Sequence, residues 1–111
     1  MDSSLDISLW LLKMNLVSNN RVITGVSGRC PRFVILPNKT RGLDDLVFSG
    51  VTTIEELHIN QDIEFVGRDV CANCPNLKKI YIYKGQDYLI PNLTHYNDAE
   101  ICYVDVIDSK D

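Results

Sequence analysis

A 23-residue period in the apolar residues is the feature that most constrains what this chain can fold into. Between Val47 and Ile82 one pattern of apolar positions is written twice. The first copy is Val47, Phe48, Val51, Ile54, Leu57 and Ile59, and the second is Val70, Cys71, Cys74, Leu77, Ile80 and Ile82. A fixed period of this size is typical of a solenoid, in which each coil buries its apolar face by stacking on its neighbours.

Each copy of the pattern ends in a short strand. Leu57-His58-Ile59 and Ile80-Tyr81-Ile82 alternate apolar residues with polar or aromatic ones, which is the pattern of a half-buried strand. Val34-Ile35-Leu36 lies 23 residues before the first of them and extends the strand register back by one coil. In the same way, Leu43 lies 23 residues before Val66. Thr53 and Asn76 are expected to turn the chain before the two strands.

Residues 63–82 resemble one unit of the BspA-type leucine-rich repeat. That unit has an apolar residue, an apolar-Gly step, an Ala-Phe pair, a Cys, a Leu and a closing Ile-x-Ile. Here those places hold Ile63, Val66-Gly67, Val70-Cys71, Cys74, Leu77 and Ile80-Tyr81-Ile82. Cys71 departs from the pattern, because the family usually has Phe there, whereas the preceding coil keeps Phe48. The resemblance implies a curved stack of short strands that typically binds other proteins, here a miniature of three to four coils.

The predicted fold class is therefore a β-solenoid, leucine-rich-repeat-like, with short parallel strands stacked at a 22–23-residue period and short helical or turn segments between them. A chain of 111 residues predicts one domain. We expect an N-terminal cap over residues 1–18, repeat coils over residues 19–105, of which 19–42 are irregular, and an acidic tail over residues 106–111. Residues 83–91 resemble the closing segment of BspA-type arrays, which implies a turn and a short helical piece before a final strand.

The conformation of the N-terminal cap stays open between two alternatives. One helical face would carry Leu5, Leu9, Leu12 and Leu16, whereas Leu5, Ile7, Leu9 and Leu11 alternate as in a strand. Residues 5–17 are too short to span a bilayer, and no basic leader or small-residue cleavage site marks a signal peptide. We therefore expect a cytoplasmic protein.

Charge is distributed unevenly along the sequence. Residues 1–42 hold six of the eleven basic residues but only two of the fifteen acidic ones. One end of the solenoid is therefore predicted to be basic and the other acidic. The basic residues of the first third are Lys13, Arg21, Arg29, Arg32, Lys39 and Arg41.

The four cysteines allow two interpretations. Cys71 and Cys74 form a CxxC motif, which Cys30 and Cys102 could complete as a zinc site. Cys74 nevertheless occupies the core cysteine place of the repeat, Cys71 replaces a core Phe, and Cys102 is expected to point inward. Free cysteine packs as a small hydrophobe. We therefore favour buried structural cysteines and expect no cofactor or metal.

No catalytic constellation is recognisable in the sequence. His58 and His95 are the only histidines, and the hydroxyl and carboxylate residues form no nucleophile elbow, phosphate loop or metal-ligand run. We expect that the protein is not an enzyme.

The outward residues of the strands are the candidate functional site. Ile35, His58, Tyr81 and Tyr103 are predicted to form one row across four strands, because Cys102 and Val104 lie 22 residues after Ile80 and Ile82 and would point inward. Two further rows would flank it, one of Phe33, Glu56, Lys79 and Ile101 and one of Pro37, Asn60, Tyr83 and Asp105. Aromatic anchors in a mixed polar surround are typical of protein-binding sites. Stacked aromatic residues that only stabilise the sheet are the alternative.

The sequence therefore predicts a protein–protein interaction module whose strand face binds a protein partner of unknown identity. A small inhibitor of a host protein, encoded by a phage or mobile element, is one specific version of this hypothesis. Two alternatives remain open. A nucleic acid could bind the basic first third with strong salt dependence, although the acidic net charge argues against this. Structural self-assembly through the open coil ends is the other.

Overall fold

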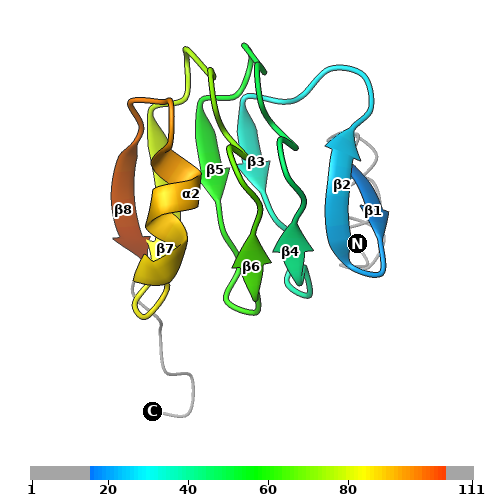
Figure 1. Ribbon diagram of the computed structural model, residues 1–111, viewed down its shortest axis with the longest axis vertical. Helices are drawn as coiled ribbons and strands as arrows, with labels where there is room; N and C mark the ends of the chain where they lie inside the picture. Colours follow the sequence, from blue (N-terminus) through cyan, green and yellow to red (C-terminus); the bar gives the residue numbers. More distant parts are fainter. Residues whose placement is uncertain (1–15, 105–111) are drawn as a thin grey trace, which may run out of the picture.

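The computed structural model describes residues 16–104 of the chain. Short strands from successive turns of the chain stack side by side into two four-stranded sheets (Figure 1). All paired strands are parallel except for the first pair, β1 and β2. Residues 16–104 therefore form a β-solenoid with one short α-helix, and the predicted fold class is confirmed.

One sheet carries the repeat on which the sequence prediction depends. Its strands, in spatial order, are β3 (Phe33–Ile35), β5 (Glu56–His58), β7 (Lys79–Tyr83) and β8 (Glu100–Val104). Val34 pairs with Leu57, and Leu57 pairs with Ile80, so three strands follow one another at the predicted 23-residue period. These three side chains point inward and have no exposed surface.

The second sheet closes the opposite side of each coil. Its strands, in spatial order, are β1 (Leu16–Asn19), β2 (Val22–Val26), β4 (Gly42–Leu43) and β6 (Phe65–Val66). Leu43 pairs with Val66, as the spacing of the sequence predicts. The core lies between the two sheets and the turns that join them, where Phe48, Ile54 and Val70 are completely buried.

The turns from the second sheet back to the first also repeat at 23 residues. Leu46 and Asp69 both have a left-handed backbone, with φ of 63° and 53°, and so do Gly50 and Asn73, with φ of 77° and 58°. The backbone N–H of Gly50 donates to the carbonyl of Ala72 at 2.9 Å. Equivalent turns therefore stack through backbone hydrogen bonds, as the strands do.

Two glycines permit neighbouring coils to approach closely. A Cβ atom placed on Gly67 would lie 2.5 Å from the backbone nitrogen of Asp45 and 2.6 Å from the carbonyl carbon of Asp44. A Cβ atom on Gly42 would overlap the ring of Phe65, which lies across that glycine from the next coil. At both places the absence of a side chain lets the adjacent coil pack against the backbone.

Polar side chains before the strands bind the preceding coil. The hydroxyl of Thr53 donates to the carbonyl of Cys30 at 2.6 Å, and the amide of Asn76 donates to the carbonyl of Thr52 at 2.6 Å. Each bond spans one coil of sequence. Thr53 and Asn76 therefore turn the chain and also satisfy a carbonyl that no strand bonds.

The N-terminal end differs from the irregular coil that the sequence predicts. β1 and β2 form an antiparallel hairpin, whose turn residues Asn20 and Arg21 have φ of 54° and 66°. Two successive positive φ values define the tight hairpin turn that Asn favours. Only residues 16–18 of the expected cap are described, and they belong to a strand. The choice between helix and strand for residues 1–15 lies outside the described residues.

The C-terminal end closes as predicted, with a turn, a short helical piece and a final strand. The 3₁₀ turn η1 (Asp87–Leu89) leads into helix α2 (Ile90–Thr94), and β8 follows. Leu89 and Leu93 are buried against the last coil. The predicted acidic tail, residues 106–111, lies outside the described residues.

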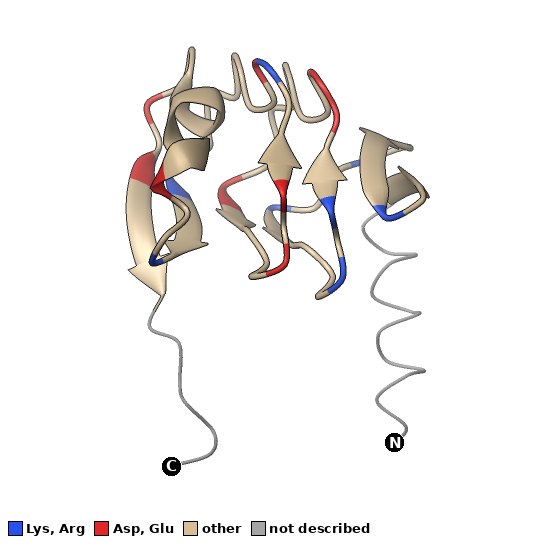
Figure 2. Ribbon diagram, turned by 60° about the horizontal axis from the view of Figure 1, so that its bottom comes forward, with Lys and Arg blue, Asp and Glu red and all other residues tan. Residues whose placement is uncertain are grey.

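The charge asymmetry of the sequence becomes an asymmetry along the stack (Figure 2). Within the described residues, 16–42 contain Arg21, Arg29, Arg32, Lys39 and Arg41 but no Asp or Glu. Every described acid lies from Asp44 onward. Because the coils stack in sequence order, these five basic residues lie on the first coils, where the described part of the chain has no acid.

Candidate partner-binding face

The outer surface of the β3–β5–β7–β8 sheet presents most of the residues that the sequence selects. The alternation that turns Val34, Leu57 and Ile80 inward turns their neighbours outward. We call these outward residues of β3, β5 and β7 the strand face. They are Phe33, Ile35, Glu56, His58, Lys79, Tyr81 and Tyr83. The pairing aligns Phe33, Glu56 and Lys79 in one row and Ile35, His58 and Tyr81 in a second, as predicted.

The centre of the strand face is a stacked pair of rings. The ring centroids of His58 and Tyr81 are 4.3 Å apart and their planes differ by 15°. The Nε2 atom of His58 lies 3.3 Å from Oε1 of Glu56. Both histidine contacts come from residues on the same surface, so His58 is held in place by an acid on one side and an aromatic ring on the other.

The β3 end of the strand face leaves large apolar side chains in solvent. Phe33 is 46% exposed and Ile35 is 48% exposed. The guanidinium carbon of Arg32 lies 5.3 Å from the centroid of the Phe33 ring, within the range of a cation–π contact. Arg32 also has its Nε atom 3.8 Å from a carboxylate oxygen of Glu55. Sequence reasoning missed Arg32 as a neighbour of this face, although it adjoins Phe33 and lies 23 residues before Glu55.

The predicted register of the last strand is wrong. Ile101 pairs with Ile80 and Cys102 with Tyr81, so β8 follows β7 at 21 residues instead of 22. Tyr103 therefore pairs with Ile82 and leaves the row that it was predicted to complete, and Cys102 takes its place beside Tyr81. The connection through η1 and α2 replaces the repeat here, so the stack no longer fixes the length of the coil. Ile101 likewise points inward, and Glu100 stands beside Lys79 in the flanking row.

Tyr103 instead connects β8 to η1. Its hydroxyl donates to a carboxylate oxygen of Asp87 at 2.9 Å. Because the neutral phenol is the donor in this bond, the contact with Asp87 raises the pKa of Tyr103 above its usual value.

The second flanking row does not form as predicted. Asn60 is buried, and its amide donates to the carbonyls of Thr40 at 2.8 Å and Asn38 at 3.1 Å. It therefore joins two coils and is not available at the surface. Only Tyr83 of this row belongs to a described strand, because β3 ends before Pro37 and Asp105 lies outside the described residues.

The cysteines divide into a buried group and one strand-face neighbour. Cys30, Cys71 and Cys74 are buried and Cys102 is partly exposed, and none of the four forms a disulfide. The prediction that Cys102 points inward is wrong, since it pairs with outward-facing Tyr81. Burial raises the pKa of the Cys30 thiol to about 11 and also raises the pKa values of Cys71 and Cys74. No group of three or more His, Cys, Asp or Glu residues within residues 16–104 is arranged to hold a metal ion.

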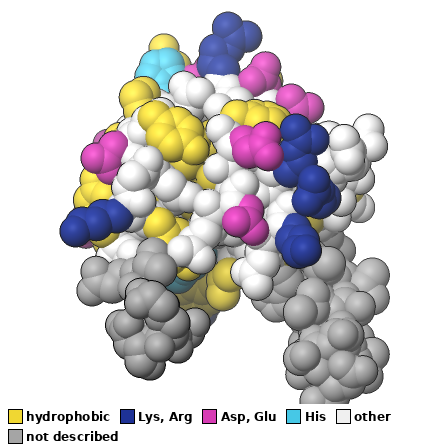
Figure 3. Space-filling view, turned by 90° about the horizontal axis from the view of Figure 1, so that it is seen from below, with side chains coloured by type: hydrophobic (Ala, Val, Ile, Leu, Met, Phe, Trp, Pro, Cys, Tyr) yellow, Lys and Arg dark blue, Asp and Glu magenta, His cyan; other side chains and the backbone are white. Residues whose placement is uncertain are grey.

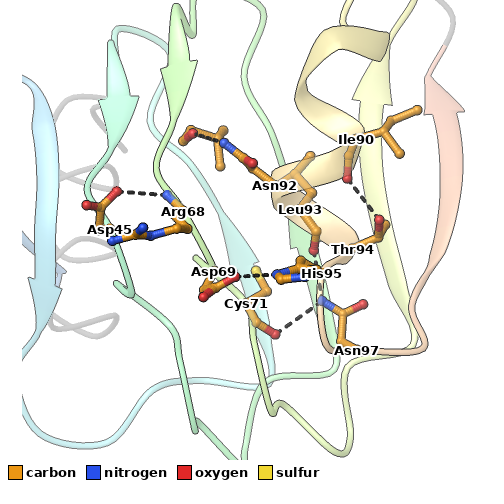
Figure 4. Close-up of polar contacts among 11 residues, drawn as sticks. Asp45, Arg68, Asp69, Cys71, Ile90, Asn92, Leu93, Thr94, His95 and Asn97 are labelled. Carbon is orange, nitrogen blue, oxygen red and sulfur yellow. Dashed lines mark hydrogen bonds and ion pairs between the residues drawn. The ribbon is translucent and has the colours of Figure 1, made fainter.

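The second histidine belongs to the scaffold, away from the strand face. Nδ1 of His95 lies 2.5 Å from a carboxylate oxygen of Asp69, one of the contacts that join the chain around α2 to the preceding coil in Figure 4. Beside it, the amide of Asn97 donates to the carbonyls of Cys71 and Leu93. These side chains fasten the closing segment to the stack.

Two basic residues of the first coils contact acids of the following coil. Arg41 contacts Glu64 at 3.4 Å, and Arg32 contacts Glu55 as described above. Figure 3 shows Lys and Arg side chains gathered along one side of the molecule, seen from below, with Asp and Glu side chains next to them. The positive charge of this side is therefore partly neutralised within the chain.

No family model, curated protein or solved structure matches this chain. The class of protein defined by the fold is the β-solenoid. No helix in residues 16–104 is long and apolar enough to cross a membrane.

Proposed function

We propose that this chain is a non-enzymatic protein-binding module and that its partner docks on the strand face. The observation that carries the proposal is the exposure of Phe33 and Ile35, at 46% and 48%, next to the stacked rings of His58 and Tyr81. The core needs none of these four side chains, because it is built from the inward residues of the same strands. Aromatic and aliphatic anchors with a polar rim are what protein interfaces favour.

A purely structural role explains only part of this surface. The His58–Tyr81 stack stabilises the pairing of β5 and β7 by itself, as cross-strand pairs generally do. Phe33 and Ile35 lie at the end of the sheet, where half of each side chain remains in contact with water. Leaving that apolar area exposed brings no gain to the isolated chain, whereas a partner that covers it removes it from water.

Within this proposal, the chain is a miniature of the BspA-type leucine-rich repeat that acts as an accessory factor or inhibitor of another cytoplasmic protein. The resemblance of residues 63–82 to that repeat supports this version.

The test is a pull-down with three forms of the tagged chain. The wild type is compared with Ile35→Ser/Tyr81→Ser, which alters only outward side chains, and with Tyr88→Ser/Tyr96→Ser, which removes two exposed tyrosines away from the strand face. We expect one protein to be retained by the wild type and the control and lost by the strand-face variant. Equal retention by all three would contradict the proposal. Capture only of material that nuclease removes would favour the basic first coils instead.

A further inference from the structure

The last strand of the solenoid presents an open edge. Within the described residues, β8 pairs only with β7 and is the outermost strand of its sheet (Figure 1). The terminal strand of the other sheet, β6, is covered instead, because the amide of Asn92 in α2 donates to the carbonyl of Val66 at 2.8 Å. An open edge offers a row of backbone donors and acceptors to another strand.

β8 has few of the devices that usually protect an edge, and its one charged side chain, Glu100, stands at its first residue. Its sequence, Glu-Ile-Cys-Tyr-Val, contains no Lys, Pro or Gly, and its five residues pair with β7 without a bulge. The other outer strand of the sheet, β3, has only three residues and lies between Pro31 and Pro37. Of the two edges, β8 is the one suited to further pairing.

The direction of the hydrogen bonds defines which residues of β8 face the open edge. The N–H of Glu100 donates to the carbonyl of Lys78 at 2.8 Å, toward β7. Backbone groups of alternate residues in a strand point to the same side, so Cys102 and Val104 also bond toward β7. The N–H and C=O groups of Ile101 and Tyr103 therefore point toward the open edge of the sheet, where no described residue bonds them.

We propose that two copies of this chain associate by antiparallel pairing of β8 with β8 about a twofold axis at Cys102. In this register Ile101 of each copy lies opposite Tyr103 of the other. Their edge-facing backbone N–H and C=O groups form the hydrogen-bonded pairs. Glu100, the only charged residue of the strand, lies opposite Val104, so no like charges oppose each other. Cys102 meets Cys102 in a non-hydrogen-bonded pair.

This register is favoured over the neighbouring registers because it pairs the largest number of β8 residues. An axis at Cys102 pairs all five residues of β8, whereas moving the axis by one residue leaves strand ends unpaired. The twofold operation keeps the outward side of each sheet on the same surface, so the dimer would carry one eight-stranded sheet with two strand faces side by side. The inference does not depend on the proposed function, since it uses the edge of the sheet and not its face.

Cys102 provides a direct test, because it is the only one of the four thiols that is not buried. The Cα atoms of a non-hydrogen-bonded pair lie about 4.5 Å apart, within the roughly 4.4–6.8 Å that a disulfide spans. Diamide accepts the two electrons and two protons that two thiols release on forming a disulfide. The full chain is treated with diamide, and crosslinking is followed on non-reducing gels while light scattering gives the mass of untreated samples over a range of concentrations.

Two variants separate edge pairing from chance collision. Tyr103→Pro removes the backbone N–H that faces the open edge without removing a bond to β7. Tyr103→Ala is the matched control, because it shortens the same side chain but keeps this N–H. Circular dichroism and thermal unfolding check that both remain folded. Cys102→Ser tests whether association needs the thiol.

We expect the mass to rise from 12.6 kDa toward twice that value with concentration for the wild type, Tyr103→Ala and Cys102→Ser. Tyr103→Pro should remain a monomer, and its crosslinked band should be lost. A monomer at every concentration in the wild type would overturn the proposal. So would a folded Tyr103→Pro variant that dimerises or crosslinks like the wild type, or pairing of β8 only with a strand from a different protein.

Discussion

His58 and Tyr81 lie face to face across neighbouring strands, with ring centroids 4.3 Å apart. Directly opposed residues on one face of a sheet contribute about 0.2–1 kcal/mol beyond an Ala–Ala pair. We predict a coupling free energy of about 0.5–1 kcal/mol between these two side chains. A double-mutant cycle of His58→Ala and Tyr81→Ala, measured by urea unfolding, gives this value directly.

The same cycle separates stability from binding. If the rings serve only the sheet, each single variant should lose stability but retain the partner captured by the wild type. If they form the docking site, Tyr81→Ala should lose the partner under conditions where it remains fully folded. Additive effects on the free energy of unfolding would contradict the predicted coupling.

Replacement by alanine should destabilise the protein to different extents at Gly67 and at Gly42. The Cβ of Gly67→Ala would meet backbone atoms of Asp44 and Asp45, which cannot move without separating two coils. The Cβ of Gly42→Ala would meet the ring of Phe65, which is 41% exposed and has room to rotate away. Overpacking typically costs about 1–3 kcal/mol.

We therefore expect Gly67→Ala to destabilise by at least about 2 kcal/mol, in the upper part of the range for overpacked sites. Gly42→Ala should cost less than about 1 kcal/mol, below that range, because the Phe65 ring can move. Urea unfolding of both variants checks the order. Adding Phe65→Ala to Gly42→Ala should remove most of the remaining clash. An equal loss of unfolding free energy at the two glycines would contradict this prediction, because it would mean that the backbone of the neighbouring coil moves as easily as the Phe65 ring.

The repeat made the stacking of β3, β5 and β7 predictable. Apolar residues at Val34, Leu57 and Ile80 recur at one spacing, and a shift of one residue would expose all three. The register of β8 could not be obtained in this way. Both alternating sets of that strand, Ile101 with Tyr103 and Cys102 with Val104, are apolar or aromatic, so either could face the core. Only the length of the η1–α2 connection decides between them, and that segment does not follow the repeat.

The remaining misses have similar physical causes. Asn20 and Arg21 carry a hairpin signal, since Asn favours positive φ in a tight turn between strands. The 23-residue period does not reveal it, because an antiparallel hairpin does not repeat at that spacing. Asn60 follows an expected strand and looks like a surface amide in the sequence. Its burial arises because β5 ends at His58, after which the chain turns and the amide reaches carbonyls of the preceding coil.

Tyr103 should titrate at higher pH than an unperturbed tyrosine. Its hydroxyl donates to Asp87, which favours the protonated phenol and raises the pKa of Tyr103 above about 10. The difference between the ultraviolet titrations of the wild type and Tyr103→Phe isolates this group. Asp87→Asn should lower its pKa toward the ordinary value, because the acceptor loses its charge. An unchanged midpoint in Asp87→Asn would contradict the assigned contact.

Asn60 should be more important for stability than its position after a strand suggests. Its buried side-chain amide donates to the carbonyls of Asn38 and Thr40. Its backbone carbonyl, which alanine keeps, accepts from the side chain of Gln86 at 2.9 Å. Asn60→Ala leaves two carbonyls of the preceding coil without that donor, at a cost of about 1–3 kcal/mol for a buried group. Asn92→Ala, which removes one partly buried bond to Val66, should cost less in the same urea experiment. Equal losses would show that water replaces the Asn60 amide.

The buried thiols predict a loss of stability at alkaline pH. In the unfolded chain a cysteine ionises near pH 9.0, whereas burial raises the pKa of folded Cys30 to about 11 and raises that of Cys71 as well. Because the thiolate is favoured only after unfolding, the contribution of these groups to the free energy of unfolding is complete below pH 9 and falls as the pH rises toward 11.

Other groups also titrate in this range, so the wild type is compared with Cys30→Ala/Cys71→Ala. Urea unfolding between pH 8 and 10.5 should show a steeper fall for the wild type than for this variant. Parallel curves for the wild type and the double variant would mean that the thiols are accessible enough to ionise in the folded chain.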